Sequence, residues 1–415
     1  MDVMELADRL WRGEVSVEDQ HPFTVFGEAQ EVADGVAFVP SFANVSAFRT
    51  DDGLVLVDTG SAPLAAHVHA TLRRWDAAPL HTAVYSHGHI DHVFGVPVFE
   101  AEATQRGWPA PRVVAHDALP ARFDRYMLTA GYNEVVNQRQ FQAPQLRWPR
   151  EYRYPDMTYR DALVLDVGAT RFELNHCRDE TDDHTWTWVP ERRVLCCGDL
   201  FIWASPNAGN PQKVQRYPRE WALGLRRMAA LGAELLLPGH GVPVVGADRI
   251  ARALSETAEL LEHLHDETVA MMNAGACLDD IVHTVRAPAH LLERPYLRPV
   301  YDEPEFVVRN IWRLYGGWWD GDPAHLKPAP AGSLAAELAK LAGGATALAR
   351  RALAIADAGD LRLAAHLAEL AWQAARDDAE VRAARAEVYE RRVAAEASTM
   401  AKGVFAWAVT EARAD

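Results

Sequence analysis

The sequence predicts a layered α/β domain followed by an all-helical half. Three observations support this prediction. Short apolar runs alternate with a helical stretch over the first 248 residues, apolar positions at helical spacing follow from residue 249, and alanine dominates from residue 333. A chain of 415 residues exceeds one compact core, so two or three domains are expected. We place the domains at residues 1–248 and 249–415.

The first apolar runs are short enough to be strands. Residues 36–39 and 54–57 are two such runs, and the second follows the turn signal Asp51-Asp52-Gly53. We expect them to form a β-hairpin that ends at Asp58. A helix is expected over about residues 62–75 and a strand over residues 82–85. Further strand signals lie at residues 112–115, 163–165, 171–174, 185–188, 194–197 and 235–237.

The second half has helical patterns. A long helix is expected over residues 249–273, and the prolines and tryptophans of residues 288–330 predict a packed connector. A later helical stripe consists of Leu361, Ala364, Ala365, Ala368 and Trp372. The run Ala358-Gly359-Asp360 ends the helix before it. We expect two or three antiparallel helices, docked on the first domain or on another copy of the chain.

Charge and composition exclude several classes of protein. The 42 Lys and Arg residues against 58 Asp and Glu residues give a net charge of −16, which disfavours nucleic acid and anionic lipid as partners. No apolar run is long enough for a membrane span, and no signal peptide is visible, so a cytoplasmic location is expected. The four cysteines contain no CxxC pair. Any metal must therefore be held by histidines and carboxylates.

The sharpest motif is HxHxDH, formed by His87, His89, Asp91 and His92 directly after the strand predicted over residues 82–85. Two imidazoles two residues apart point the same way from an extended backbone. The Asp and His that follow can turn toward a second ion, so one loop can supply two metals. A cluster of surface histidines is the alternative, which the internal carboxylate disfavours.

This segment resembles the metallo-β-lactamase superfamily, whose hallmark is the motif at the edge of an αββα sandwich. The resemblance covers about residues 30–248 and includes, in the superfamily's order, Asp58-Thr59-Gly60, Gly198-Asp199 and Pro238-Gly239-His240-Gly241. It implies that Asp199 bridges two metal ions and that His240 completes the second site. A short carboxylate at a strand end can span two ions about 3.5–4 Å apart, whose combined charge lowers the pKa of a shared water.

The superfamily's usual third His of the first site lies 19 residues before the bridging Asp, where Glu180 stands in this chain. His184 is the alternative ligand, because positions 180 and 184 share a strand face. A Glu at this place is a feature of the class III alkylsulfatases. The helical half is also similar to their dimerisation domain, in runs such as residues 265–268, 317–323 and 341–345. The resemblance therefore implies a homodimer.

Taken together, the resemblance implies a hydrolase of a small-molecule ester with two zinc ions per chain. Its metal ligands would be His87, His89 and Glu180 for the first ion, Asp91, His92 and His240 for the second, and Asp199 for both. Asp91 and Asp199 are also expected to act in catalysis. Cleavage of a sulfate ester by a metal-bridging hydroxide is the leading hypothesis. The alternative is another ester class on the same site: a carboxylic ester, lactone, thioester or phosphoester.

The residues that would contact the substrate are less well defined. The sulfatases bridge their metals with Glu and carry an Arg in the loop after the bridge, whereas residues 206–213 of this chain contain no Arg. Lys213 or Arg216 is expected to replace it, although a point charge and a bidentate fork are not equivalent. Tyr132, Asn133 and His184 are further candidates.

Two hypotheses from other classes are less favoured. A redox di-iron protein of similar fold would carry a Glu where His89 stands, and metal analysis would reveal the iron. A pure interaction scaffold built on the helices would leave seven ligand-type residues without a purpose. A nucleic-acid-processing member of the superfamily is disfavoured by the acidic charge.

Overall fold

The structure, a computed structural model, describes residues 2–414 and contains two compact units. The first comprises Met1–Ala130 and Pro149–Gly317, and the second comprises Gly131–Trp148 and Trp318–Asp415. A segment from the middle of the sequence therefore belongs to the same unit as the C-terminal helices. Residue 248 lies inside the first unit, so the assignment of separate roles to residues 1–248 and 249–415 stays a prediction.

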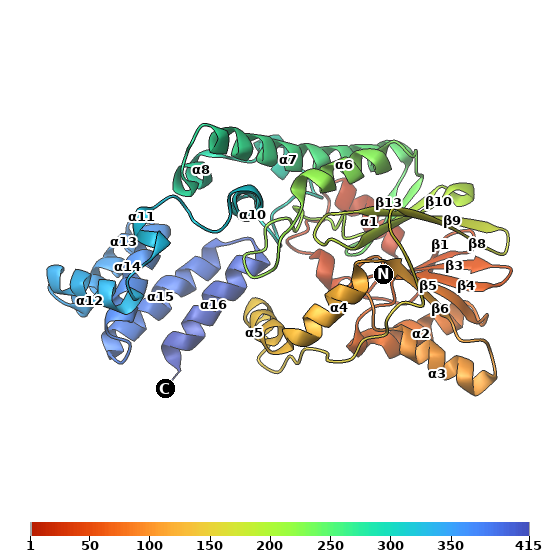
Figure 1. The fold of residues 1–415 in the computed structure, drawn as a ribbon, viewed down its shortest axis with the longest axis horizontal. Coiled ribbons are helices and arrows are strands. Elements are labelled where there is room, and N and C mark those ends of the chain that lie inside the picture. The colour runs from red at the N-terminus through yellow and green to blue at the C-terminus, as the bar shows by residue number, and fades with distance from the viewer. Residues whose placement is uncertain (1, 415) are drawn as a thin grey trace. The chain divides into compact units, whose positions relative to one another are not determined.

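The first unit is built on two sheets (Figure 1). The first sheet contains, in spatial order, β1 (Gln30–Ala33), β2 (Val36–Val39), β3 (Val45–Thr50), β4 (Gly53–Val57), β5 (Leu80–Val84), β6 (Arg112–His116) and β7 (Met157–Tyr159). The second contains β13 (Val244–Val245), β12 (Leu235–Pro238), β11 (Val194–Gly198), β10 (His184–Val189), β9 (Thr170–Cys177) and β8 (Ala162–Val167). Buried side chains of both sheets, such as Phe48 and Phe172 at 5.4 Å between ring centroids, form one core. The sheets thus pack face to face.

Helices cover both outer faces of this sandwich. Val68 of α2 (Ala65–Trp75), Phe99 of α3 (Val96–Arg106) and Phe123 of α4 (Leu119–Leu128) complete the core on the far side of the first sheet. On the second sheet, α6 (Pro218–Ala229) contacts β9 and α7 (Ala247–Asn273) contacts β12. Figure 1 shows this order of layers. The αββα fold expected from the sequence is confirmed.

The remaining helical turns of the first unit are short or peripheral. They are α1 (Val3–Trp11), η1 (Pro22–Thr24), η2 (Ala62–Leu64), η3 (Pro190–Arg192), α8 (Leu278–Thr284), α9 (Ala289–Leu292) and α10 (Pro304–Gly316).

The hairpin prediction was wrong in its pairing. β2 and β4 are both strands, but each pairs with β3, which lies between them. The turn at Asp51-Asp52 does make a hairpin, and its strands are β3 and β4. The missed strand reads VSAFRT, and its Ser46 and Ala47 are weak β-formers that are buried here by tertiary packing.

The second unit is helical. Its elements are α5 (Ala130–Phe141), which begins at the last residue of the first unit, α11 (Pro323–Leu326), α12 (Ala331–Leu341), α13 (Ala345–Asp357), α14 (Leu361–Ala374), α15 (Ala379–Ala395) and α16 (Thr399–Arg413). The expectation of two or three helices from residue 333 was therefore too low. The alanine-rich sequence hides the breaks, because short turns such as residues 342–344 interrupt it without a proline.

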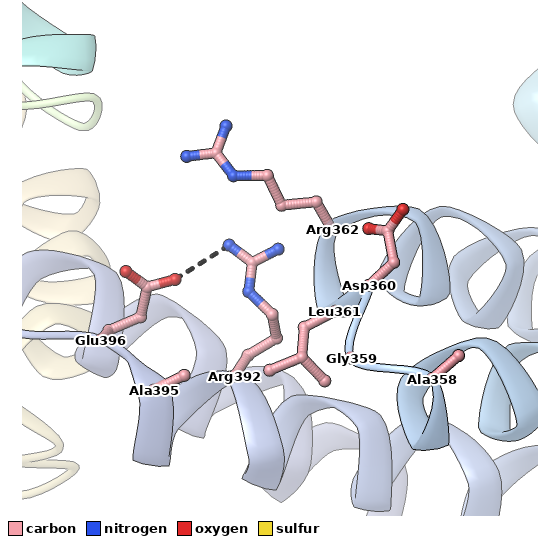
Figure 2. Close-up of a pocket in the computed structure, with 8 residues that line it drawn as sticks. All are labelled: Ala358, Gly359, Asp360, Leu361, Arg362, Arg392, Ala395 and Glu396. Atoms are coloured by element: carbon pink, nitrogen blue, oxygen red, sulfur yellow. Dashed lines mark hydrogen bonds and ion pairs between the residues drawn. The ribbon is translucent and has the colours of Figure 1, made fainter.

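The predicted break before residue 361 is confirmed. Asp360 caps α14 by accepting a hydrogen bond from the backbone N–H of Leu363 at 3.0 Å. Ala364, Ala365 and Ala368 are buried in the core of this unit. The turn borders a polar pocket, in which Figure 2 shows Arg392 paired with Glu396 at 3.0 Å.

The packed connector is only partly as expected. Val307, Val308 and Ile311 of α10 are buried, whereas Trp318, which the sequence suggested would pack, is 72% exposed. Among the helices of residues 2–414, none has the length and apolar character that a membrane crossing requires.

The contact between α5 and α16 gives a test of how the second unit is held together. A Cβ on Gly403 of α16 would lie 2.1 Å from the carbonyl oxygen of Gln140, so Gly403→Ala must move one helix. We expect a loss of about 1–3 kcal/mol in the free energy of unfolding, measured by urea denaturation. Gly131→Ala is the matched control, because a Cβ there meets nothing within 4 Å. Equal stability of the two variants would contradict this packing.

Candidate metal centre

The HxHxDH segment forms the loop between β5 and α3, and a buried carboxylate anchors its ends. Asp58, directly after β4, accepts hydrogen bonds from the N–H of Ser86 at 2.7 Å and from its hydroxyl at 2.8 Å. Oδ2 of Asp58 also lies 2.8 Å from Nδ1 of His92. With Nδ1 directed at Asp58, Nε2 of His92 is the nitrogen that can bind a metal.

Two groups of ligand-type side chains meet at this loop. One group is His87, His89 and Asp199, and the other is Asp91, His92 and His240. Within each group the ligand atoms all lie within 4.8 Å of one another. The loop provides four of these residues, while Asp199 follows β11 and His240 follows β12. The carboxyl ends of two parallel strands of the second sheet therefore complete the site.

Asp199 faces both groups. Its Oδ2 lies 3.7 Å from Nε2 of His87 and 3.3 Å from Nε2 of His240, and its Oδ1 lies 3.5 Å from Nε2 of His92. Asp91 lies near His240, with its Oδ2 3.5 Å from Nε2 of His240. A carboxylate in this position is arranged to share two cations.

Electrostatics prepare these groups for cations. Burial, together with the neighbouring imidazoles, lowers the pKa of His87 well below its ordinary value, and burial also lowers that of His89. Burial alone would raise the pKa of Asp199, but His240 and His92 hold it well below its usual range. His87 and His89 are therefore neutral, as metal binding requires, whereas Asp199, Asp58 and Asp91 raise the pKa of His92 against its burial, so a metal bound there would displace its proton.

The residues present fit a pair of divalent cations. His92 Nε2, Asp199 Oδ1 and Glu180 Oε2 are buried and have no hydrogen-bond partner among residues 2–414. Buried polar atoms are normally satisfied, so these three are suited to a group that accepts their lone pairs. Imidazole nitrogens combined with carboxylate oxygens are a donor set typical of zinc.

The two alternatives for the remaining ligand have different surroundings. Oε1 of Glu180 lies 3.4 Å from Nδ1 of His89, at the edge of the first group. Nδ1 of His184 lies 2.5 Å from Asp179, and its ring stacks on His87 at 4.8 Å between centroids. Its Nε2 lies against the backbone of Gly198, where an added Cβ would be 2.4 Å away. Apart from this contact with Asp179, both ring nitrogens of His184 are buried without a hydrogen-bond partner among residues 2–414, so the choice of Glu180 over His184 stays a prediction.

Arg216, a candidate for the substrate's anionic group, is already paired. It is buried, its Nη2 lies 3.2 Å from Oε1 of Glu180, and its Nη1 donates to the backbone oxygen of Glu180. Asn207 donates to the same Oε1 at 2.5 Å. Burial raises the pKa of Glu180 to about 8 against the opposing charge of Arg216. The guanidinium of Arg216 therefore offsets part of the effect of burial on the Glu180 carboxylate.

The other candidates have different positions. Lys213 is half-buried in the loop after Asp199, and burial, with the nearby Arg216, lowers its pKa to about 8. Tyr132 and Asn133 lie on α5, in the second unit, and Tyr132 is 65% exposed. Their role in binding a substrate stays a prediction.

Sequence reasoning missed Arg122, which is 3% exposed on α4 and contacts Asp182 and Asp183 beside the site. A signal was present in the sequence. Leu119, Arg122, Phe123 and Tyr126 follow one another at helical spacing, so the arginine interrupts an otherwise apolar stripe. An arginine in such a position requires a buried partner.

Comparisons with known proteins agree with this fold. Residues 39–240 match the family described as "Metallo-beta-lactamase superfamily", and residues 277–415 match "Alkyl sulfatase dimerisation". A linear primary-alkylsulfatase from Pseudomonas sp. is 28% identical over 82% of this chain and 68% of its own length. An (R)-specific secondary-alkylsulfatase from Pseudomonas sp. is 25% identical over 78% of this chain and 53% of its own length.

A solved structure has the same fold over most of the chain. The stereoselective inverting sec-alkylsulfatase Pisa1 from Pseudomonas sp. has a TM-score of 0.83 at 22% identity, covering 93% of this chain and 66% of that chain. The chain thus spans between about half and two thirds of the length of these relatives.

Residues 39–240 therefore match the metallo-beta-lactamase superfamily, in agreement with the αββα fold described above. The same chain also matches the alkyl sulfatase dimerisation family over residues 277–415, and the curated relatives named above are alkylsulfatases. The resemblance inferred from the sequence is confirmed.

The two alternative ligands can be distinguished by metal analysis. We expect Glu180→Ala to lower the metal content of purified protein more than His184→Ala does, because Oε1 of Glu180 lies 3.4 Å from His89 whereas Nδ1 of His184 lies 2.5 Å from Asp179. Plasma mass spectrometry of both variants gives the ranking, and thermal unfolding verifies that each is folded. The reverse ranking would transfer the ligand role to His184.

Proposed function

We propose that this chain, a hydrolase acting on ester bonds, cleaves sulfate esters at a centre of two zinc ions. The observation that carries the proposal is the position of Asp199, whose two oxygens lie 3.3–3.7 Å from histidines of both ligand groups. That arrangement supports one carboxylate shared by two cations. The named activities of the relatives support the sulfate ester as the substrate class.

The proposed roles of the residues follow from their contacts. His87, His89 and Glu180 would hold the first ion, Asp91, His92 and His240 the second, and Asp199 both. When bound, two such ions supply Lewis acidity and lower the pKa of water toward neutrality. Asp58 orients His92 through its Nδ1, and the backbone oxygen of Phe42 accepts a hydrogen bond from Nδ1 of His240.

The ion pair of Arg216 with Glu180 affects how the substrate would be bound. Because this guanidinium is engaged with a proposed ligand, it would act mainly by placing Glu180. Lys213 is the better candidate for the anionic group of a sulfate ester, and its lowered pKa makes this contact strongest below about pH 8. Hydrolysis of a carboxylic ester, lactone, thioester or phosphoester on the same site is the alternative.

We further propose that the protein is a homodimer, since residues 277–415 match the family described as "Alkyl sulfatase dimerisation". The cytoplasmic location expected from the sequence stays a prediction.

The substrate class is tested with a panel of alkyl sulfates, phosphate esters, carboxylic esters, lactones and thioesters, each assayed with and without a chelator. We expect sulfate release that the chelator abolishes and zinc restores. Asp199→Ala should lower turnover at least about 100-fold. Loss of a hydrogen bond to a metal ligand typically costs about 10–100-fold in activity, and loss of the ligand itself should cost more. Asp166→Ala, at an exposed carboxylate on β8, is the matched control. Chelator-sensitive activity on another ester class, without sulfate release, would refute the sulfate ester and identify that class as the substrate.

The oligomeric state is tested by size-exclusion chromatography of the 415-residue chain with light scattering on the eluted peak. We expect a mass twice that of the 46.0 kDa chain, independent of dilution over the range tested. A single species at the mass of one chain would contradict the dimer.

A further inference from the structure

The middle of the ligand loop is held by a group other than Asp58. Asp58 contacts the loop at Ser86 and His92, whereas the N–H of Gly88 donates to Oδ2 of Asp183 at 2.9 Å. Gly88 stands between His87 and His89, two of the proposed ligands. The position of its peptide therefore sets where both imidazoles point.

Asp183 is itself held from the opposite side. Its Oδ1 accepts from Nε of Arg122 at 2.8 Å, and another nitrogen of Arg122 donates to Asp182. Arg122 is 3% exposed and Asp183 is fully buried. Both charges are removed from water, so each depends on the other, and breaking such a pair is costly.

Packing leaves this pair little freedom to move. A Cβ on Gly88 would lie 2.7 Å from Cδ of Arg122 and 3.1 Å from Oδ2 of Asp183. The aliphatic part of the Arg122 side chain therefore lies against the backbone of Gly88, while its guanidinium binds the carboxylate of Asp183. Three elements meet here: α4 with Arg122, the ligand loop with Gly88, and the segment before β10 with Asp183.

We propose that the Arg122–Asp183 pair is a positioning device for the metal centre: it fixes the Gly88 peptide and so sets the geometry and metal affinity of His87 and His89. The inference rests on the proposed metal-binding role of these histidines. The hydrogen bonds of Arg122 go to Asp183 and Asp182, so it positions the ligands through Asp183 and the loop, while its charge also lowers the pKa of His89.

The test measures zinc affinity by competition with a chromogenic chelator, starting from metal-free full-length protein. Arg122→Met removes the charge and keeps the length of the side chain, and Asp183→Asn weakens the pair while keeping an acceptor for Gly88. We expect zinc to bind about 10–100-fold more weakly in both variants. Arg73→Met is the control, because Arg73 pairs with Glu102 at 2.7 Å in the same unit and otherwise donates to the backbone oxygens of Asp76 and Ala78. Its affinity should equal that of the wild type.

A spectroscopic readout separates positioning from general stability. At saturating Co²⁺, Arg122→Met should change the visible absorption of the bound metal, because its ligands are displaced, whereas Arg73→Met should not. Gly88→Ala is a second variant that shifts the pair without removing a buried charge, and it should change the spectrum in the same way. Wild-type affinity and spectrum in folded Arg122→Met and Gly88→Ala would overturn the proposal.

Failure of this inference is distinguishable from failure of the proposed function. Zinc binding that weakens as expected, in a protein that cleaves no sulfate ester, supports the positioning role and refutes only the substrate. A wild-type protein that binds no zinc overturns both.

Discussion

Two buried carboxylates, Asp58 and Asp183, hold the loop that contributes four of the seven proposed ligands. The loop is irregular, so its backbone has no ladder of its own and depends on such contacts. Asp58 lies at the end of β4 in the first sheet, and Asp183 lies just before β10 in the second. The loop is therefore fixed only when both sheets are in place, and the metal centre is a consequence of the sandwich.

Charge balance is the second constraint on the site. Asp91, Asp199 and Glu180 converge with four histidines, and acids this close repel one another unless cations compensate them. Arg216 compensates Glu180 and Arg122 compensates Asp183. Two of the buried arginines thus pair with carboxylates at or beside the candidate centre.

The helical unit also takes part of its structure from the middle of the sequence. Residues 131–148 follow α4, which carries Arg122, and they pack with the C-terminal helices through contacts such as Gln142 with the backbone of Gly403 at 2.7 Å. A deletion of the C-terminal helices would therefore expose α5 as well. The proposed dimerisation part and the catalytic part cannot be separated by a single cut of the chain.

The sequence by itself determined the fold class, the strands with strong apolar runs, and the order of the motifs that contain His87, Asp199 and His240. These features are local, because strand patterns and ligand spacing are set within a few residues. Only the tertiary structure decided that β3 separates β2 from β4, that Arg216 pairs with Glu180, and that Arg122 holds Asp183. These partners lie 36 and 61 positions apart for the two arginines, and burial of charges at such separations depends on how the sheets and helices pack.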